Sequence, residues 1–191
     1  LTGGLVDPPA EFINCGRMNF AKTMTRCPTP YDADVGHDIA AQFADLAPEL
    51  QQLLAGAAGS SPYLSGLIRK EQDWLREALA DNPDMVRASL LTPPDPDADL
   101  PQSLRQQKRR VALYVALCDL AGVWRLDQVT TALTEFADLA VGVALRARVA
   151  AEIDRGKLPG ARDADKADMG GICVLAMGKM GAHELNYSSD I

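Results

Sequence analysis

The stretch Val174–Ile191, which reads VLAMGKMGAHELNYSSDI, marks a change of pattern in this chain. It overlaps an apolar run, ICVLAM at 172–177, whose length and β-branched members predict a buried strand. Gly178 and Gly181 follow and predict a sharp turn with exposed backbone N–H groups, as in loops that bind phosphate. The residues before this stretch have a helical period. The sequence therefore predicts that helices give way to a sheet near residue 172.

A helical period begins at residue 34 and predicts a series of amphipathic helices. Pro48 suits the first turn of a helix, while Gly56 and Gly59 are expected to end it. Further helices and breaks are expected as follows: a helix behind a Ser60 or Ser61 cap with Pro62 in its first turn, a break at 81–83, a short helix to about Leu91, long helices at 103–123 and 127–155, and a C-cap at Gly156. Short connections between long helices favour antiparallel neighbours.

Composition changes along the chain predict four parts. They are an irregular N-terminal segment at 1–33, a helical region at 34–156 with a proline-rich linker near 92–101, a glycine- and charge-rich linker at 157–170, and the truncated start of a further domain at 171–191. Leu1 stands where an initiator methionine would be, so we expect the sequence to be a piece of a longer protein.

Composition also limits the classes of function. The 191 residues are 47% hydrophobic, enough to bury a core, and their formal net charge is −7. Such a charge disfavours broad binding to nucleic acid or to an anionic membrane. The four cysteines, Cys15, Cys27, Cys118 and Cys173, form no metal-binding or disulfide pattern, so we expect small buried side chains in a reducing, cytoplasmic compartment.

A basic run opens one of the long helices, where the helix dipole disfavours cations. Its members are Arg105, Lys108, Arg109 and Arg110. The nearby carboxylates of Asp95, Asp97 and Asp99 are the favoured partners, and contact with the domain that follows or with an acidic partner protein is the alternative.

Three kinds of nucleotide site compete for the glycine loop. A P-loop is excluded because Cys173 and Met180 stand where it needs glycine and a hydroxyl. A dinucleotide fingerprint fits poorly because Ala176 replaces its first glycine, and it leaves an oxidoreductase as a minor alternative. The third kind uses Asp190: an acidic residue after Ile191 would place two carboxylates on one face of a strand, where they could hold two divalent metals.

The stretch VLAMGKMGAHELNYSSDI closely resembles the signature of the glutamine synthetase adenylyltransferase/adenylyl-removing enzymes, which are polymerase-β-like nucleotidyltransferases. Those proteins carry a strand, a G-K-L-G-type loop and then S-S-D-I-D. The resemblance implies a mainly α-helical region followed by the opening strands of an α/β (α+β) nucleotidyltransferase domain. It also implies that Gly178, Lys179 and Gly181 bind phosphate, that Ser189 supports the loop or ligand, and that Asp190 is catalytic as the first Mg²⁺ ligand.

The family has two such domains, and ELNYSSDI behind a helical region resembles the N-terminal one. By resemblance, that domain removes AMP from a tyrosine of glutamine synthetase by phosphorolysis, giving ADP, whereas the C-terminal domain adds AMP from ATP. The implied partners are glutamine synthetase, a nucleotide and a nitrogen-signalling regulatory protein. The second metal ligand would follow Ile191, so the 191 residues alone are expected to be inactive. A helical protein-interaction module without catalysis is the alternative from another class.

Overall fold

The computed structural model describes residues 19–189, and all regular structure within this range is helical. The predicted residues Asp190 and Ile191, and most of the lead-in at 1–33, lie outside the described range. The helices are α1 (Phe20–Thr23), α2 (Ala33–Gln42), α3 (Pro48–Ser60), α4 (Pro62–Lys70), α5 (Gln72–Ala80), α6 (Pro83–Leu90), α7 (Leu100–Leu120), α8 (Leu126–Asp154), the 3₁₀ turns η1 (Asp163–Lys166) and η2 (Met169–Gly171), and α9 (Gly178–Gly181).

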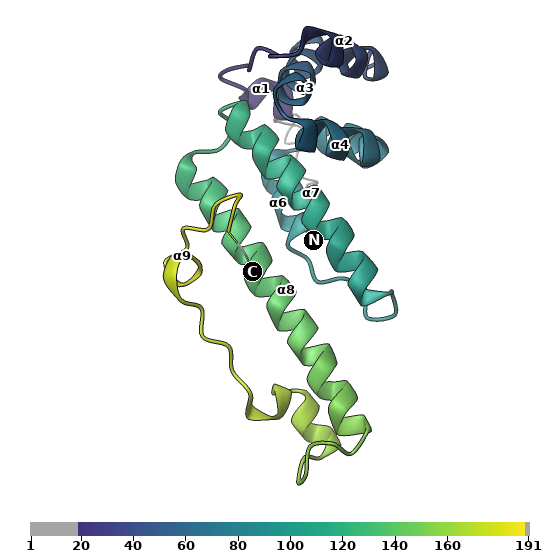
Figure 1. Ribbon diagram of the computed structural model, residues 1–191, viewed down its shortest axis with the longest axis vertical. Coiled ribbons are helices and arrows are strands. Elements are labelled where there is room, and N and C mark those ends of the chain that lie inside the picture. The colour runs from purple at the N-terminus through teal and green to yellow at the C-terminus, as the bar shows by residue number, and fades with distance from the viewer. Residues whose placement is uncertain (1–18, 190–191) are drawn as a thin grey trace, which may run out of the picture.

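The long helices α7 and α8 form an antiparallel hairpin, as their short connection predicts (Figure 1). Gly122, with φ of +63°, closes the end of α7 in a left-handed conformation. The short helices α1–α4 gather around the end of the hairpin where α7 leads into α8, while the chain after α8 returns along α8 (Figure 1). No helix in the described part of the chain is long and apolar enough to cross a membrane.

The core is built from α1 to α8 around the ring of Tyr114, whose side chain is fully buried. The rings of Phe20, Trp74 and Trp124 meet Tyr114 edge to face, with centroids 5.7, 6.2 and 5.9 Å away. Trp124 and Phe136 are buried and Trp74 packs against the core, which confirms the core positions expected for these three residues. The core therefore ties the short helices to the hairpin.

The start of α4 has the expected cap, and the start of α7 has a cap of the same kind that the sequence did not predict. The Ser61 hydroxyl accepts a hydrogen bond from the N–H of Leu64 at 3.3 Å, and Pro62 opens α4. Asp99 caps α7 in the same way through the N–H of Gln102, at 2.9 Å. The long helices predicted at 103–123 and 127–155 are confirmed with small shifts of their ends.

The prediction that Gly56 and Gly59 end a helix is wrong, because α3 runs through both to Ser60. A Cβ on Gly56 would lie 2.1 Å from the carbonyl oxygen of Pro28, and one on Gly59 would lie 2.5 Å from that of Asp32. The two glycines allow the extended segment before α2 to lie directly on α3. Close approach of two backbones, and not helix termination, explains these glycines.

The strand predicted at 172–177 is absent from the described residues, and this run is extended and exposed. The exposed fractions of Val174, Leu175 and Met177 are 54, 82 and 81%. A strand needs a neighbour to pair its N–H and C=O groups, and no residue in the range 19–189 supplies one. The observed fold is thus a helical assembly, and the opening strands of an α/β domain are not seen in it.

The basic run pairs with a different acid from those expected. Arg109 and Arg110 both bind the carboxylate of Glu71, with N···O distances of 2.8 and 3.0 Å. Glu71 is only 5% exposed and lies at the junction of α4 and α5. Within the described residues, no carboxylate of Asp95, Asp97 or Asp99 forms an ion pair with the run, so the prediction of these partners is wrong.

The predicted linker at 157–170 is folded onto the far end of α8. Lys166 in η1 forms an ion pair with Asp154 at 2.5 Å, and Arg146 donates a hydrogen bond to the carbonyl of Ala167 at 3.2 Å. Among the cysteines described, Cys118 is buried as expected, whereas Cys27 and Cys173 are exposed, contrary to expectation. The chain therefore reaches the C-terminal stretch from a fixed point on α8.

Candidate functional site

The glycine loop forms one helical turn, α9. Gly178 has φ of +57°, a value that favours glycine, and the preceding Met177 is extended. A Cβ on Gly181 would lie 2.5 Å from the carbonyl oxygen of Ala176. Both glycines are therefore required by the backbone, and the predicted sharp turn is present.

The loop presents polar groups to solvent. Lys179 is exposed, and within the described residues the backbone N–H groups of Gly178, Lys179 and Met180 donate no hydrogen bond. Exposed N–H groups beside a lysine are the groups that bind phosphate in other loops. The geometry of the loop is compatible with the predicted role, although the turn is short.

The next part of the stretch is anchored on α8 through Leu185. Its side chain is 4% exposed, and its N–H donates to the hydroxyl of Thr134 at 3.4 Å. The Thr134 hydroxyl in turn donates to the carbonyl of Thr130 at 2.8 Å, so the acceptor is held in one orientation. Leu185 is the only residue of the range 172–189 that is fully buried.

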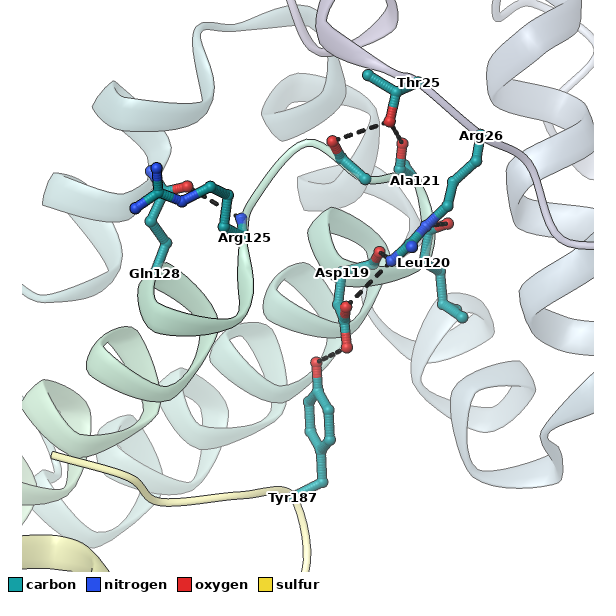
Figure 2. A network of polar contacts seen from close by, with 9 residues as sticks. Thr25, Arg26, Asp119, Leu120, Ala121, Arg125, Gln128 and Tyr187 are labelled. Atoms are coloured by element: carbon teal, nitrogen blue, oxygen red, sulfur yellow. Dashed lines mark hydrogen bonds and ion pairs between the residues drawn. The ribbon is translucent and has the colours of Figure 1, made fainter. Parts of the chain in front are cut away.

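Tyr187 makes a second anchor, this time on α7. Its hydroxyl donates to Oδ2 of Asp119 at 3.3 Å, while Arg26 donates to Oδ1 of the same carboxylate at 3.3 Å (Figure 2). Partial desolvation of the Tyr187 hydroxyl raises its pKa, and the charge of Asp119 and the hydrogen bond to it add to this effect. The phenol therefore remains a hydrogen-bond donor at neutral pH.

Asn186, which lies between these two anchors, forms a tight turn with Ser188 and Ser189. Its side-chain oxygen accepts from the hydroxyls of Ser188 at 3.1 Å and Ser189 at 2.9 Å. The Ser189 hydroxyl also accepts from the N–H of Asn186 at 3.2 Å. Ser188 thus has the ordinary turn role expected of it. Ser189 is fixed in the same turn by Asn186, and its predicted support of the loop or ligand stays a prediction.

The loop and Ser189 line separate hollows. Met180 lines one of about 220 Å³ against α8. Ser189 lines an apolar one of about 430 Å³ between α7 and α8, which the cationic Arg105 and Lys108 also border. Val141 on α8 borders both hollows. Among the described residues no hydrogen bond joins Gly178–Gly181 to Ser189, so the structure does not bring the predicted phosphate loop and the serine into one pocket.

The predicted metal ligand Asp190 lies outside the described residues, and its role stays a prediction. Within the range 19–189 no three His, Cys, Asp or Glu side chains gather as metal ligands. The anchoring residues Asp119, Thr134 and Tyr187 were missed by the sequence analysis. Tyr187 stands inside the signature and could have been found from it. Asp119 lies 68 positions away, and no local pattern in the sequence links it to Tyr187.

Comparisons with known proteins agree with this signature. The family model for glutamate-ammonia ligase adenylyltransferase matches residues 50–191. A bifunctional glutamine synthetase adenylyltransferase/adenylyl-removing enzyme of Bradyrhizobium sp. strain BTAi1 is 45% identical over 149 residues, which cover 74% of this chain and 15% of the relative. The proteins of the same name from Rhodopseudomonas palustris strain HaA2 and Caulobacter vibrioides are 40 and 42% identical over 83 and 72% of this chain and 17 and 15% of their own lengths. No solved structure matches.

The relatives are all of one class of protein: they are named as enzymes that transfer or remove adenylyl groups. The chain belongs to the glutamate-ammonia ligase adenylyltransferase family. It spans about one sixth of the length of the curated relatives that it matches.

Proposed function

We propose that this chain belongs to the half of the enzyme that removes AMP from adenylylated glutamine synthetase. The observation that carries the proposal is the stretch Val174–Ile191, with its glycine loop and S-S-D-I ending, directly behind a helical region. In the proposed reaction an oxygen of inorganic phosphate attacks the phosphorus of the adenylyl-tyrosine. The bond from phosphorus to the tyrosine oxygen breaks, and the products are ADP and the unmodified tyrosine.

The proposed phosphate-binding groups are those of the glycine loop. Two features support this role: the exposed cationic side chain of Lys179, and the N–H groups at Gly178–Met180, which have no partner within residues 19–189. They can bind an anion without first breaking bonds to those residues. Gly181 would keep the turn tight. Ser189, fixed by Asn186, would hold the start of the acidic segment in place.

Mg²⁺ is the proposed cofactor, and Asp190 would be its first ligand. In the sequence Asp190 directly follows Ser188 and Ser189, and carboxylate and hydroxyl oxygens are of the donor type that Mg²⁺ prefers. When bound, the ion would stabilise negative charge on the phosphoryl oxygens. Because the resemblance places a second acidic ligand after Ile191, we expect the 191 residues alone to be inactive.

The proposal is tested with the full-length enzyme that contains this chain. Adenylylated glutamine synthetase, inorganic phosphate and Mg²⁺ are mixed with the enzyme, and ADP is measured by chromatography. The proposal expects ADP from the wild type and at least a hundredfold slower release from Asp190→Asn, as is typical when one preorganised electrostatic group is removed. Unchanged ADP release by Asp190→Asn would contradict the assigned role.

Lys179→Ala is a milder probe of the loop. Loss of a charged hydrogen bond to phosphate should raise the KM for phosphate by about tenfold or more and leave the KM for adenylylated glutamine synthetase unchanged. Lys70→Ala is the matched control, since Lys70 is also exposed and forms no ion pair among the described residues. Equal phosphate KM values for the two variants would rule out phosphate contact by Lys179.

The second candidate is a helical interaction module without chemistry of its own. One observation favours it: the core extends from Phe20 to Phe136 and includes no residue of the stretch 171–189. A nitrogen-signalling regulatory protein or glutamine synthetase would be the partner. Binding of such a partner by residues 34–155 alone, with 171–191 dispensable, would support this candidate over the catalytic one.

A further inference from the structure

We propose that Asp119 is a positioning residue for the nucleotidyl-transfer site. It would act through the hydroxyl of Tyr187, which it holds at the end of α7, and so fix the turn from which Asp190 follows in the sequence. This inference rests on the proposed function and adds to it: part of the helical hairpin is a component of the site that handles the adenylyl group.

The carboxylate of Asp119 is itself well anchored. Its Oδ1 accepts from Arg26 at 3.3 Å, and the same guanidinium donates to the backbone carbonyl of Asp119 and, at 3.2 Å, to that of Leu120 (Figure 2). These carbonyls belong to the last turn of α7, where the helix dipole favours a cation, and the carbonyl of Asp119 also accepts from the N–H of Gly122 at 3.0 Å. Oδ2 of Asp119 therefore faces Tyr187 from a side chain that is already oriented.

Two anchors on two helices define the direction of the segment. Leu185 is fixed on α8 through Thr134, and Tyr187 is fixed on α7 through Asp119. One anchor would leave the segment free to rotate about the attachment point. Two anchors separated by one residue remove that freedom, and they lie immediately before Ser188 and Ser189. The hairpin thus sets where the signature leaves the helical region.

The two anchors differ in what they contribute. Leu185 is buried, so its side chain stabilises the fold, whereas the Tyr187 side chain is 53% exposed. Removal of the Tyr187 hydroxyl alone should cost little stability. What it should change is the orientation of the turn, and a role in orientation can be measured separately from a role in folding.

The first test measures the anchor directly in the 191-residue chain. Tyr187→Phe should speed amide hydrogen exchange in 185–189 by about two- to tenfold, the range that one net hydrogen bond supports, and leave the core helices unchanged. Asp119→Ala should have the same local effect, while Asp119→Asn, which keeps an oxygen acceptor, should restore most of the protection. Tyr31→Phe is the control, because Tyr31 is 95% exposed. Unchanged exchange in Tyr187→Phe would overturn the anchor.

The second test uses the full-length enzyme. Tyr187→Phe and Asp119→Ala should each raise the Mg²⁺ concentration for half-maximal ADP release by about two- to tenfold, the double variant should be no worse than either, and the KM for adenylylated glutamine synthetase should stay constant. Unaltered Mg²⁺ dependence in both single variants, or additive losses in the double variant, would refute the positioning role. A wild type that released no ADP would defeat the proposed function, and the exchange experiment would still decide whether Asp119 anchors the turn.

Discussion

At the scale of single residues, Glu71 is the one buried charged side chain among residues 19–189. Burial alone raises the pKa of its carboxyl, but the hydrogen bonds and charges of Arg109 and Arg110 outweigh that effect, so its pKa lies below the ordinary value of 4.5. Arg110 also lies over the ring of Trp74, at 5.1 Å from its centroid. One carboxylate thus joins the α4–α5 junction to α7.

Glu71→Gln should lower the free energy of unfolding by about 1–3 kcal/mol at neutral pH, because the two guanidinium groups lose their charged partner. A depressed carboxyl pKa stabilises the folded state above the unfolded pKa. The difference between wild type and variant should therefore be full above pH 4.5 and disappear as the pH falls through the pKa of the folded state. Urea titrations at several pH values measure it, with the exposed Glu77→Gln as control, and equal losses for the two variants would contradict the account.

For Tyr114 we expect a substitution that stabilises the protein, in contrast to that of Glu71. Its hydroxyl is buried without a hydrogen-bond partner among the described residues, and burial is the main cause that raises its pKa. Tyr114→Phe removes a desolvated polar group and keeps the aromatic contacts, so the free energy of unfolding should rise by up to about 1 kcal/mol. Thermal unfolding checks this, and a loss of more than 1 kcal/mol would show that the hydroxyl has a partner.

At the scale of elements, α3 is limited by what lies on it. Gly56→Ala should destabilise the protein by about 1–3 kcal/mol, because its Cβ would meet the backbone of Pro28 and force α3 away. Gly66→Ala in α4 is the matched control: no atom lies within 4 Å of its Cβ, so the helix should gain about 0.5–1 kcal/mol. Chemical denaturation of both variants decides the point, and a gain at both positions would contradict the contact.

The sequence predicted the helices well because their caps and periods are local. Ser61 and Gly156 mark helix ends through bonds or backbone angles that involve neighbouring residues only. The sequence-based predictions failed where the structure depends on contacts between residues far apart in the chain. The packing of Pro28 on Gly56 and the pairing of Glu71 with Arg109 join residues far apart in the chain, and a glycine or an arginine alone does not reveal its partner.

Only part of the candidate site could be predicted, because some of its features are local and others depend on distant residues. The turn at Gly178–Gly181 follows from its own glycines and is present, whereas the strand before it depends on partner strands and is absent from the described residues. The anchors of Leu185 and Tyr187 are tertiary contacts that no local pattern predicts. Roles for Lys179 and Asp190 remain predictions.

At the scale of the whole molecule, the structure is a helical core with the signature laid along its hairpin (Figure 1). The core stops before the stretch 171–189, yet Leu185 and Tyr187 attach this stretch to α8 and α7. The helical region and the signature therefore form one structural unit.

The central claim is that the enzyme containing this chain transfers the adenylyl group from tyrosine to phosphate. The most direct measurement supplies ³²P-labelled inorganic phosphate with adenylylated glutamine synthetase and Mg²⁺ to the full-length enzyme. Phosphorolysis predicts that the label appears in ADP as its β-phosphate. Release of AMP with all label left in inorganic phosphate would show hydrolysis and would contradict the account.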